Sequence, residues 1–296
     1  MPQRTVWRWR FKNMTVLVTG AGGLTASRIV HKLVEQGEEV LALDRVSPLS
    51  GLEELQQRGK VRVAEADVTD LSAIETAILD NQVSQIIHTA AILPPTSEED
   101  PSRGCDVNIG GTNNIFDAAS RLRVKRVVYP SSIAVYGDQS DYGETVLNEG
   151  SLRFPFSLAI WGGKQANELA APAYLANTGL DSRRLRICTV FGHGRVTGRS
   201  AAASAMISAV AIGEPYVSPV IASQTSAYIY VEDVAECLIR LAFATRLERD
   251  VYCVPTHRVS LGKIAEKLRA ILPDAEIASA PDAAGFDKSI EWTAHA

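Results

Sequence analysis

The sequence predicts an α/β fold, in which a parallel sheet is covered by helices on both faces. Two observations support this prediction. Between residues 14 and 192, short apolar runs of strand length alternate with runs whose apolar residues recur at helical spacing, a pattern that is typical of consecutive βαβ units. The first such unit, residues 14–45, is complete: a strand, a glycine-rich turn, a helix and a second strand follow one another. Because helical connections place consecutive strands in parallel, we expect one large sheet.

The first unit has the chemistry of a phosphate-binding turn. Its first strand runs directly into Gly20, Gly22 and Gly23, and glycine permits positive φ and the close approach of another group to the backbone. The free N–H groups of the following helix favour an anion. Asp44 ends the second strand, where its carboxylate can accept both ribose hydroxyls of an adenosine and would repel a 2′-phosphate. We therefore predict a dinucleotide site that prefers NAD to NADP, a preference that the neighbouring Arg45 could soften.

The remaining elements follow from the same patterns. We expect strands where short apolar runs are rich in β-branched residues and helices where apolar residues recur every three or four positions. The further strands are expected at residues 61–64, 85–89, 126–129, 183–190 and 251–254. The further helices are expected at residues 71–79, 107–120, 164–177, 201–212, 231–244 and 261–272. Ser260 is the expected N-cap of the last helix, and residues 217–229 are expected to form irregular chain and short strands.

The pattern changes after residue 192, which suggests two parts. We expect residues 14–192 to form the dinucleotide-binding domain and residues 193–296 to form a small substrate-binding part, with the chain free to cross between the two. Residues 1–13 are basic and aromatic and lack the apolar core of a secretory signal. We interpret them as an extension before the first strand.

Composition excludes several functional classes. The chain of 296 residues has a net charge of −4 and no long basic run, so nucleic acid is not expected as a partner. No apolar stretch is long enough for a membrane span. The 4 cysteines are scattered, with no C-x-x-C pair, which indicates free thiols in a reducing cytoplasm and no metal site.

Between residues 15 and 272, several motifs resemble, in order, those of the extended short-chain dehydrogenase/reductases, in the NAD-dependent epimerase/dehydratase group. The motifs are TGAGGLTA from Thr19, the pair Asp67-Val68, HTAA from His88, VNIGGTNN around Asn108, SSIAVYG from Ser131, TVFGHGR from Thr189 and YIYVEDVA from Tyr228. The resemblance implies a Rossmann-type doubly wound parallel sheet with a small C-terminal substrate-binding part. It also implies NAD as cofactor, a small-molecule substrate and a homodimer formed through the helices that begin near Val107 and Lys164.

The resemblance also assigns site residues. Ser132 falls on the family's catalytic serine or threonine, and Lys164 on the lysine that binds the nicotinamide ribose. The positions implied for cofactor binding are Gly20, Gly23, Leu24, Asp44, Arg45, Asp67, Val68, Ala90, Ala91, Asn108, Lys164 and Cys188. Cys188 can equally be a small core residue, and Ser132 can simply end a strand.

One motif departs from the family pattern. The family places YxxxK on the helix after the serine, and its tyrosine exchanges a proton with the substrate hydroxyl. Here Ile160 stands four residues before Lys164, where the tyrosine belongs, and isoleucine has no proton to exchange. Candidate replacements are Ser132, His193 and Tyr142, or a water held by Ser132 and Lys164. His193 lies in a glycine-rich loop and can equally be an exposed loop residue.

Three interpretations of Ile160 stay open: an enzyme with a different acid/base, a non-catalytic NAD-binding protein, and an altered form of an active parent. The first predicts an NAD-dependent oxidoreductase that acts on a hydroxyl or keto group of a small polar substrate, such as a sugar acid or a hydroxy acid. The Pro- and acid-rich run LPPTSEEDP from Leu93 and the short C-terminal part are similar to those of such members. A nucleotide-sugar epimerase or dehydratase is the alternative.

Overall fold

The computed structural model describes residues 15–47, 49, 51–137, 142–143, 147–151, 159–195, 199–254 and 257–285. The extension expected at residues 1–13 lies outside these ranges. Within them, no helix is long and apolar enough to cross a membrane.

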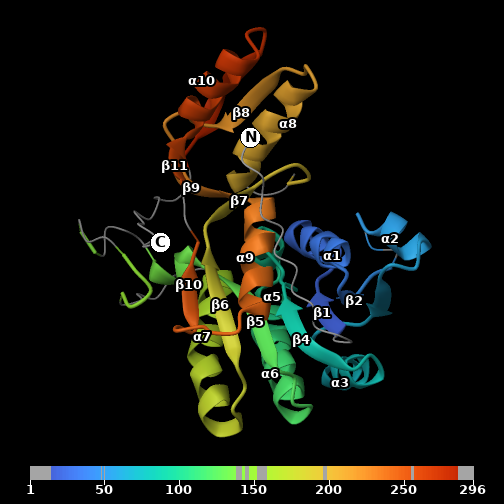
Figure 1. The fold of residues 1–296 in the computed structure, drawn as a ribbon. Coiled ribbons are helices and arrows are strands. Elements are labelled where there is room, and N and C mark those ends of the chain that lie inside the picture. Colours follow the sequence, from blue (N-terminus) through green and yellow to red (C-terminus); the bar gives the residue numbers. More distant parts are fainter. Residues whose placement is uncertain are drawn as a thin grey trace.

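A parallel sheet forms the centre of the fold (Figure 1). In the described chain it has seven strands in the order β10-β6-β5-β4-β1-β2-β3, and every neighbouring pair is parallel. This confirms the predicted doubly wound sheet. The strands are β1 (Thr15–Thr19), β2 (Glu39–Asp44), β3 (Arg62–Glu65), β4 (Val83–His88), β5 (Arg126–Ser132), β6 (Ser182–Ile187) and β10 (Val251–Cys253).

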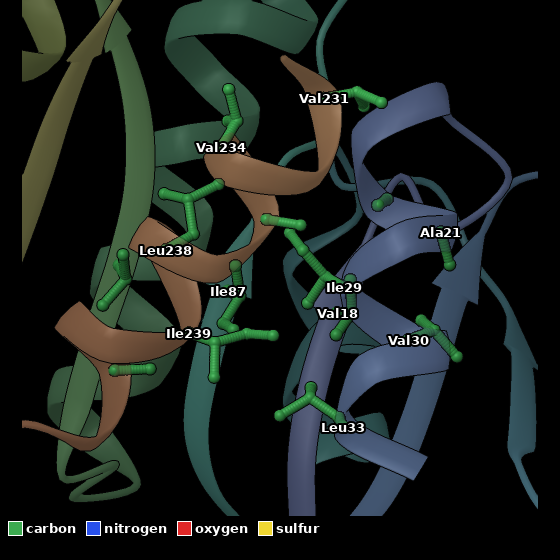
Figure 2. Packing of buried hydrophobic residues seen from close by; sticks show 14 of the residues in the cluster. Val18, Ala21, Ile29, Val30, Leu33, Ile87, Val231, Val234, Leu238 and Ile239 are labelled. Carbon is green, nitrogen blue, oxygen red and sulfur yellow. The ribbon is translucent and has the colours of Figure 1, made fainter. Parts of the chain in front are cut away.

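Helices cover both faces of the sheet, because successive strand residues point to opposite faces. Val16 and Val18 of β1 belong to a buried cluster with α1 (Leu24–Gln36) and α9 (Val231–Phe243), whereas Leu17 belongs to a second cluster with α3 (Leu71–Asp80) and α6 (Thr112–Arg121). Figure 2 shows the first cluster, in which Ile29 and Leu33 of α1 lie beside the strands and α9 packs alongside. The long helix α7 (Ala159–Thr178) adds Ala171 to the second cluster.

A second group of elements lies beyond the sheet, at the top of Figure 1. Its strands pair as β11-β9-β7 and as β12-β8. Its elements are β7 (Thr189–Phe191), η4 (Arg199–Ala201), α8 (Ala202–Ala211), β8 (Tyr216–Val220), β9 (Thr225–Tyr230), β11 (His257–Ser260), α10 (Leu261–Ile271) and β12 (Ile277–Ala284). The chain crosses back between the two groups, because α9 and β10 follow β9 yet pack with the large sheet.

Two expected elements are wrong in detail. The strand expected at residues 183–190 is two strands, because β5 ends at Ser132 opposite Ile187 and offers β6 no further partner, so β7 pairs with β9 instead. The helix expected at residues 107–120 begins as the π-helix η1 (Asp106–Gly111), which continues α5 (Pro101–Cys105) and leads into α6. The short elements α2 (Glu53–Gln57), α4 (Thr96–Glu99) and η2 (Ile133–Tyr136) complete the described fold.

Helix ends follow local sequence signals. Gly37 ends α1 with φ 84°, and its N–H donates to the carbonyls of Leu33 and Val34, as a left-handed glycine cap does. Ser260 caps α10, since its hydroxyl accepts from the Lys263 N–H at 3.3 Å. This confirms the predicted cap. The helix expected at residues 164–177 begins earlier, at Ala159, so that Ile160 and Lys164 lie one turn apart on α7.

Candidate active site at the carboxyl edge of the sheet

The glycine turn between β1 and α1 is built so that only glycine fits. Gly20 has φ +66°, and a Cβ there would lie 2.7 Å from Ala90 Cα and 2.8 Å from Ala90 N. The turn therefore presses against the end of β4. Gly23 is the N-cap of α1 and makes no side-chain cap, so the first N–H groups of α1, from Leu24 on, depend on another acceptor. A phosphate is an acceptor of the right charge at this place.

Asp44 closes the turn from the end of β2. Its Oδ2 accepts from Gly22 N at 3.0 Å, and its Oδ1 accepts from Arg45 N at 2.8 Å. The carboxylate is thus fixed beside the glycine turn, at the place where it meets an adenosine ribose in dinucleotide sites. The Arg45 side chain is exposed.

The segment after β3 forms the next part of the edge. The Asp67 carboxylate accepts from Thr69 N and Thr69 Oγ1 at 2.9 and 2.8 Å and pairs with Arg103 of α5. Burial raises the pKa of Asp67, but the hydrogen bonds from Thr69 and the charge of Arg103 outweigh it and hold the pKa below its ordinary value. Val68 is buried, and a Cβ on Gly111 would lie 2.6 Å from Val68 Cγ2. The π-helix therefore packs directly on this segment.

Asn108 in the π-helix holds the chain after β4. Its Nδ2 donates to the Ile92 carbonyl and its Oδ1 accepts from Ile92 N, both at 2.9 Å. This bidentate clamp fixes the strand end that carries Ala90 and Ala91. The Asn108 carbonyl in turn accepts from Asn167 Nδ2 of α7 at 2.8 Å. Asn108 thus connects the strand end to α7, and π-helical turns often occur where such functional packing is needed.

His88 is the buried centre of this edge. One ring nitrogen, Nδ1, lies 2.7 Å from Thr19 Oγ1 at the end of β1, and the other, Nε2, lies 3.1 Å from Thr112 Oγ1 of α6. Burial, aided by the nearby charge of Lys164, lowers the pKa of His88 to about 3. A neutral imidazole that uses both nitrogens in this way connects elements and exchanges no proton near neutral pH.

The part of α7 that carries Lys164 packs against β5 and η2 near Ser132. Gln165 Nε2 donates to the Val135 carbonyl at 2.7 Å, and Ser131 Oγ donates to Glu168 Oε1 at 2.5 Å. These bonds join Ser131 and Val135, which lie on either side of Ser132 in the chain, to the first turn of α7 after Lys164. Ser132 Oγ accepts from Ala134 N at 3.1 Å, which leaves its hydroxyl hydrogen to donate to another acceptor.

A buried charge pair that the sequence interpretation missed supports this region. Arg186 of β6 donates from Nε to Glu168 Oε1 at 3.0 Å and from Nη2 to Glu168 Oε2 at 2.6 Å. Arg186 also donates to the Tyr136 hydroxyl at 2.5 Å. Burial raises the pKa of Glu168, but the bonds from Arg186 and Ser131 outweigh it and keep the pKa below its ordinary value. An available signal was the run RRLRI, since an arginine at a buried strand position needs a buried partner.

The other candidate residues are exposed, buried or already hydrogen-bonded. His193 is exposed in the turn after β7. The Tyr142 hydroxyl donates to the Tyr136 carbonyl, and this bond occupies its proton. Cys188 is buried between β6 and β7, and burial raises the pKa of its thiol to about 12. In the described part of the chain, no group of His, Cys, Asp and Glu side chains is arranged to hold a metal ion.

The carboxyl ends of the parallel strands thus bring together the glycine turn, Asp44, the Asp67-Val68 segment, the end of β4 and Ser132, which is the edge where open α/β sheets bind ligands. Residues 16–253 match the model of the "NAD dependent epimerase/dehydratase family". The chain belongs to this family. Its cofactor is NAD, and the residues fit it: the glycine turn offers a cradle that a Cβ would fill, and Asp44 is a carboxylate fixed beside that turn.

Solved structures of similar proteins support the same assignment. The chain is similar to the holo form of a GalE-like L-threonine dehydrogenase from Cupriavidus necator, with 25% identity and a TM-score of 0.78 over 90% of this chain and 86% of that one. It is similar to UDP-glucose 4-epimerase of Thermus thermophilus in complex with NAD, with 25% identity and a TM-score of 0.79 over 96% and 90% of the chains. UDP-N-acetylglucosamine 4-epimerase of Methanobrevibacter ruminantium matches with 25% identity and a TM-score of 0.79 over 96% and 89%.

Proposed function

We propose that the chain is an NAD-dependent dehydrogenase that oxidises a hydroxyl group of a small polar substrate, and that it does so without the family's tyrosine, whose position Ile160 occupies. The observation that carries this proposal is that the glycine turn, Asp44 and Ser132 lie at one edge of the sheet, with the part of α7 that carries Lys164 packed on β5 and η2 near Ser132.

The residues divide the work by position. When bound, NAD supplies the oxidant, which accepts a hydride from the carbon that carries the substrate hydroxyl. The glycine turn binds the pyrophosphate, and Asp44 accepts hydrogen bonds from the adenosine ribose. The half-buried Lys164 would hold the nicotinamide ribose through its N–H groups. The Ser132 hydroxyl donates to the substrate oxygen and orients it. Ile160 takes no part in proton exchange, since its side chain is a hydrocarbon.

The substrate class rests on the similar proteins and on the chain itself. The solved L-threonine dehydrogenases act on a small polar molecule with a hydroxyl group, and the loop from Leu93 together with the compact C-terminal part favours a substrate of that size. L-Threonine, sugar acids and other hydroxy acids are therefore the substrates to test first.

We propose a homodimer in which α6 and α7 form the interface, because Leu169 and Leu175 of α7 are exposed apolar side chains (68% and 48%). Light scattering that gives a monomer at micromolar concentration would remove that expectation.

A nucleotide-sugar epimerase is the second candidate, since two of the similar structures are 4-epimerases of UDP-sugars. The two activities differ in the fate of the cofactor. An epimerase returns the hydride to the substrate within one cycle, whereas a dehydrogenase releases NADH. Accumulation of free NADH therefore distinguishes them. The third outcome is a protein that binds NAD and changes no substrate.

The test compares the chain with Ile160→Tyr and, as a matched control for size and aromatic shape, Ile160→Phe. Each protein is saturated with NAD and offered L-threonine, sugar acids, hydroxy acids and UDP-sugars, and both NADH and epimer products are measured. We expect the unchanged chain to release NADH. Restoring a missing proton-transfer group raises a rate by roughly 10²–10⁴-fold, and we expect Ile160→Tyr to raise the rate of NADH formation by less than that. If only Ile160→Tyr releases NADH, the chain is a catalytically impaired NAD-binding protein and the proposal is wrong.

A further inference from the structure

We propose that Lys164 itself exchanges the proton with the substrate hydroxyl in this chain, in the place of the missing tyrosine. This inference rests on the dehydrogenase function proposed above. The step is balanced: as the carbon–hydrogen bond breaks and its hydride passes to NAD, the oxygen–hydrogen bond breaks and its proton passes to the neutral amine of Lys164. The products are a carbonyl compound, NADH and the ammonium form of Lys164, which then loses its proton to water.

Lys164 lies one turn after Ile160 on α7 and one turn before Glu168, which accepts from Ser131, the neighbour of Ser132 on β5. The adjacent Gln165 donates to the Val135 carbonyl of η2. The neutral amine of a lysine has two N–H donors and one lone pair. The two donors can serve the hydroxyls of the nicotinamide ribose, and the lone pair is left to accept the proton of the substrate hydroxyl.

Nothing in the described chain fixes the side-chain nitrogen of Lys164. No described residue makes a hydrogen bond or an ion pair with Lys164 Nζ. The carboxylate one turn further along α7, Glu168, is occupied by Arg186 through both oxygens and by Ser131. Glu168 therefore contributes a favourable field at Lys164 without holding its protons.

The neighbouring titratable groups do not compete with Lys164 for the proton of the substrate hydroxyl. His88 uses both ring nitrogens and stays neutral at physiological pH. The Tyr136 hydroxyl donates to the Asn148 carbonyl at 2.8 Å and accepts from Arg186. The other titratable groups on elements packed against α7 are paired, buried or exposed: Glu98, Glu99, Arg103, Cys105, Asp106, Asp117, Arg121, Arg126, Tyr129, Arg183 and Arg184.

Burial supports the same role. It lowers the pKa of Lys164 to about 8, against a smaller opposing effect of the Glu168 charge. At pH 7 about a tenth of the lysine is then a neutral amine, which is the form that accepts a proton, and a group whose pKa lies near the working pH is an effective general base.

A first experiment needs no substrate. Trace acetic anhydride is added to the unchanged chain over a range of pH, and acetylation of Lys164 and Lys263 is followed by mass spectrometry of their peptides. Lys263 is the internal reference, because it is exposed and its bond to Glu266 raises its pKa. We expect Lys164 to become reactive with a midpoint near pH 8 and well before Lys263. If both lysines become reactive together, Lys164 stays an ammonium at working pH and the proposal is wrong.

A second experiment tests proton transfer itself. Lys164→Ala is assayed for NADH formation with the best substrate of the unchanged chain, in a series of primary alkylamines of increasing basicity, and calorimetry with NAD checks that the variant still binds its cofactor. We expect amines to restore activity in proportion to their basicity, and we expect Lys164→Arg, which keeps the charge but holds its proton, to lose about 10²–10⁴-fold in kcat/KM. Rescue that is independent of basicity, or no rescue in a variant that binds NAD, assigns Lys164 a binding role only. If the unchanged chain forms no NADH, the dehydrogenase function fails instead.

Discussion

Gly20→Ala, compared with Gly37→Ala, measures how tightly the glycine turn is packed against β4. Both glycines have positive φ, +66° and +84°, but a Cβ on Gly37 meets nothing within 4 Å, whereas one on Gly20 meets the backbone of Ala90 at 2.7 Å. Alanine in the left-handed region costs about 1–2 kcal/mol at either position. Overpacking adds about 1–3 kcal/mol at Gly20 alone, so we expect Gly20→Ala to destabilise the chain by about 2–5 kcal/mol.

Urea unfolding of the two variants gives the difference in unfolding free energy, and calorimetric titration with NAD gives the functional consequence. Because the backbone of Ala90 cannot move aside as a flexible side chain can, the turn itself must shift in Gly20→Ala and lose its fit to the pyrophosphate. Gly37→Ala should bind NAD as the unchanged chain does. Equal losses of stability and equal NAD affinity in both variants would show that the turn is not built around a contact with β4.

Three further predictions concern the cofactor, the charge pair and the histidine. Asp44→Asn should shift the ratio of NAD to NADP affinity towards NADP by about 10–100-fold, because one hydrogen bond to a charged group is worth about 1.5–3 kcal/mol. Calorimetric titration measures both affinities, and an unchanged ratio would mean that the adenosine ribose does not bind at Asp44. Glu168→Gln should destabilise the chain by about 3–5 kcal/mol, because Arg186 is left buried without its carboxylate. Urea unfolding of the double variant with Arg186→Met should show a smaller loss of unfolding free energy than the sum of the two single losses. His88 stays neutral in the folded chain down to about pH 3, whereas an unfolded histidine takes up a proton near pH 6.5, so the free energy of unfolding should fall as the pH is lowered through this window. In thermal unfolding, the stability of His88→Gln should depend less on pH than that of the unchanged chain. An equal dependence of stability on pH in the two proteins would contradict the buried neutral state.

Local patterns predicted the elements that depend on local physics. The first βαβ unit and the Ser260 cap lie where the sequence predicts them, because each depends on residues that are close together in the chain. The two strands in place of one at residues 183–190 and the π-helical start of α6 were missed. The break at Cys188 depends on where β5 stops, and the π-helix depends on the approach of Gly111 to Val68, and neither is visible in the spacing of apolar residues.

The candidate site shows the same division. The glycine turn and Asp44 could be predicted, because their function needs particular residue types at fixed spacing. The partners of buried polar groups could not, because they come from distant elements. His88 connects Thr19 to Thr112, and the pairing of Arg186 with Glu168 joins β6 to α7. Only the fold places these residues side by side.

Hydride transfer from a labelled substrate tests the central claim most directly. The chain is saturated with NAD and mixed with L-threonine, and with the other active substrates of the panel, each deuterated at the carbon that carries the hydroxyl. The account predicts that free NADH accumulates and carries the deuterium, in the unchanged chain with Ile160 in place. NAD that binds tightly but takes up no deuterium from any substrate would contradict it and leave a cofactor-binding protein without dehydrogenase chemistry.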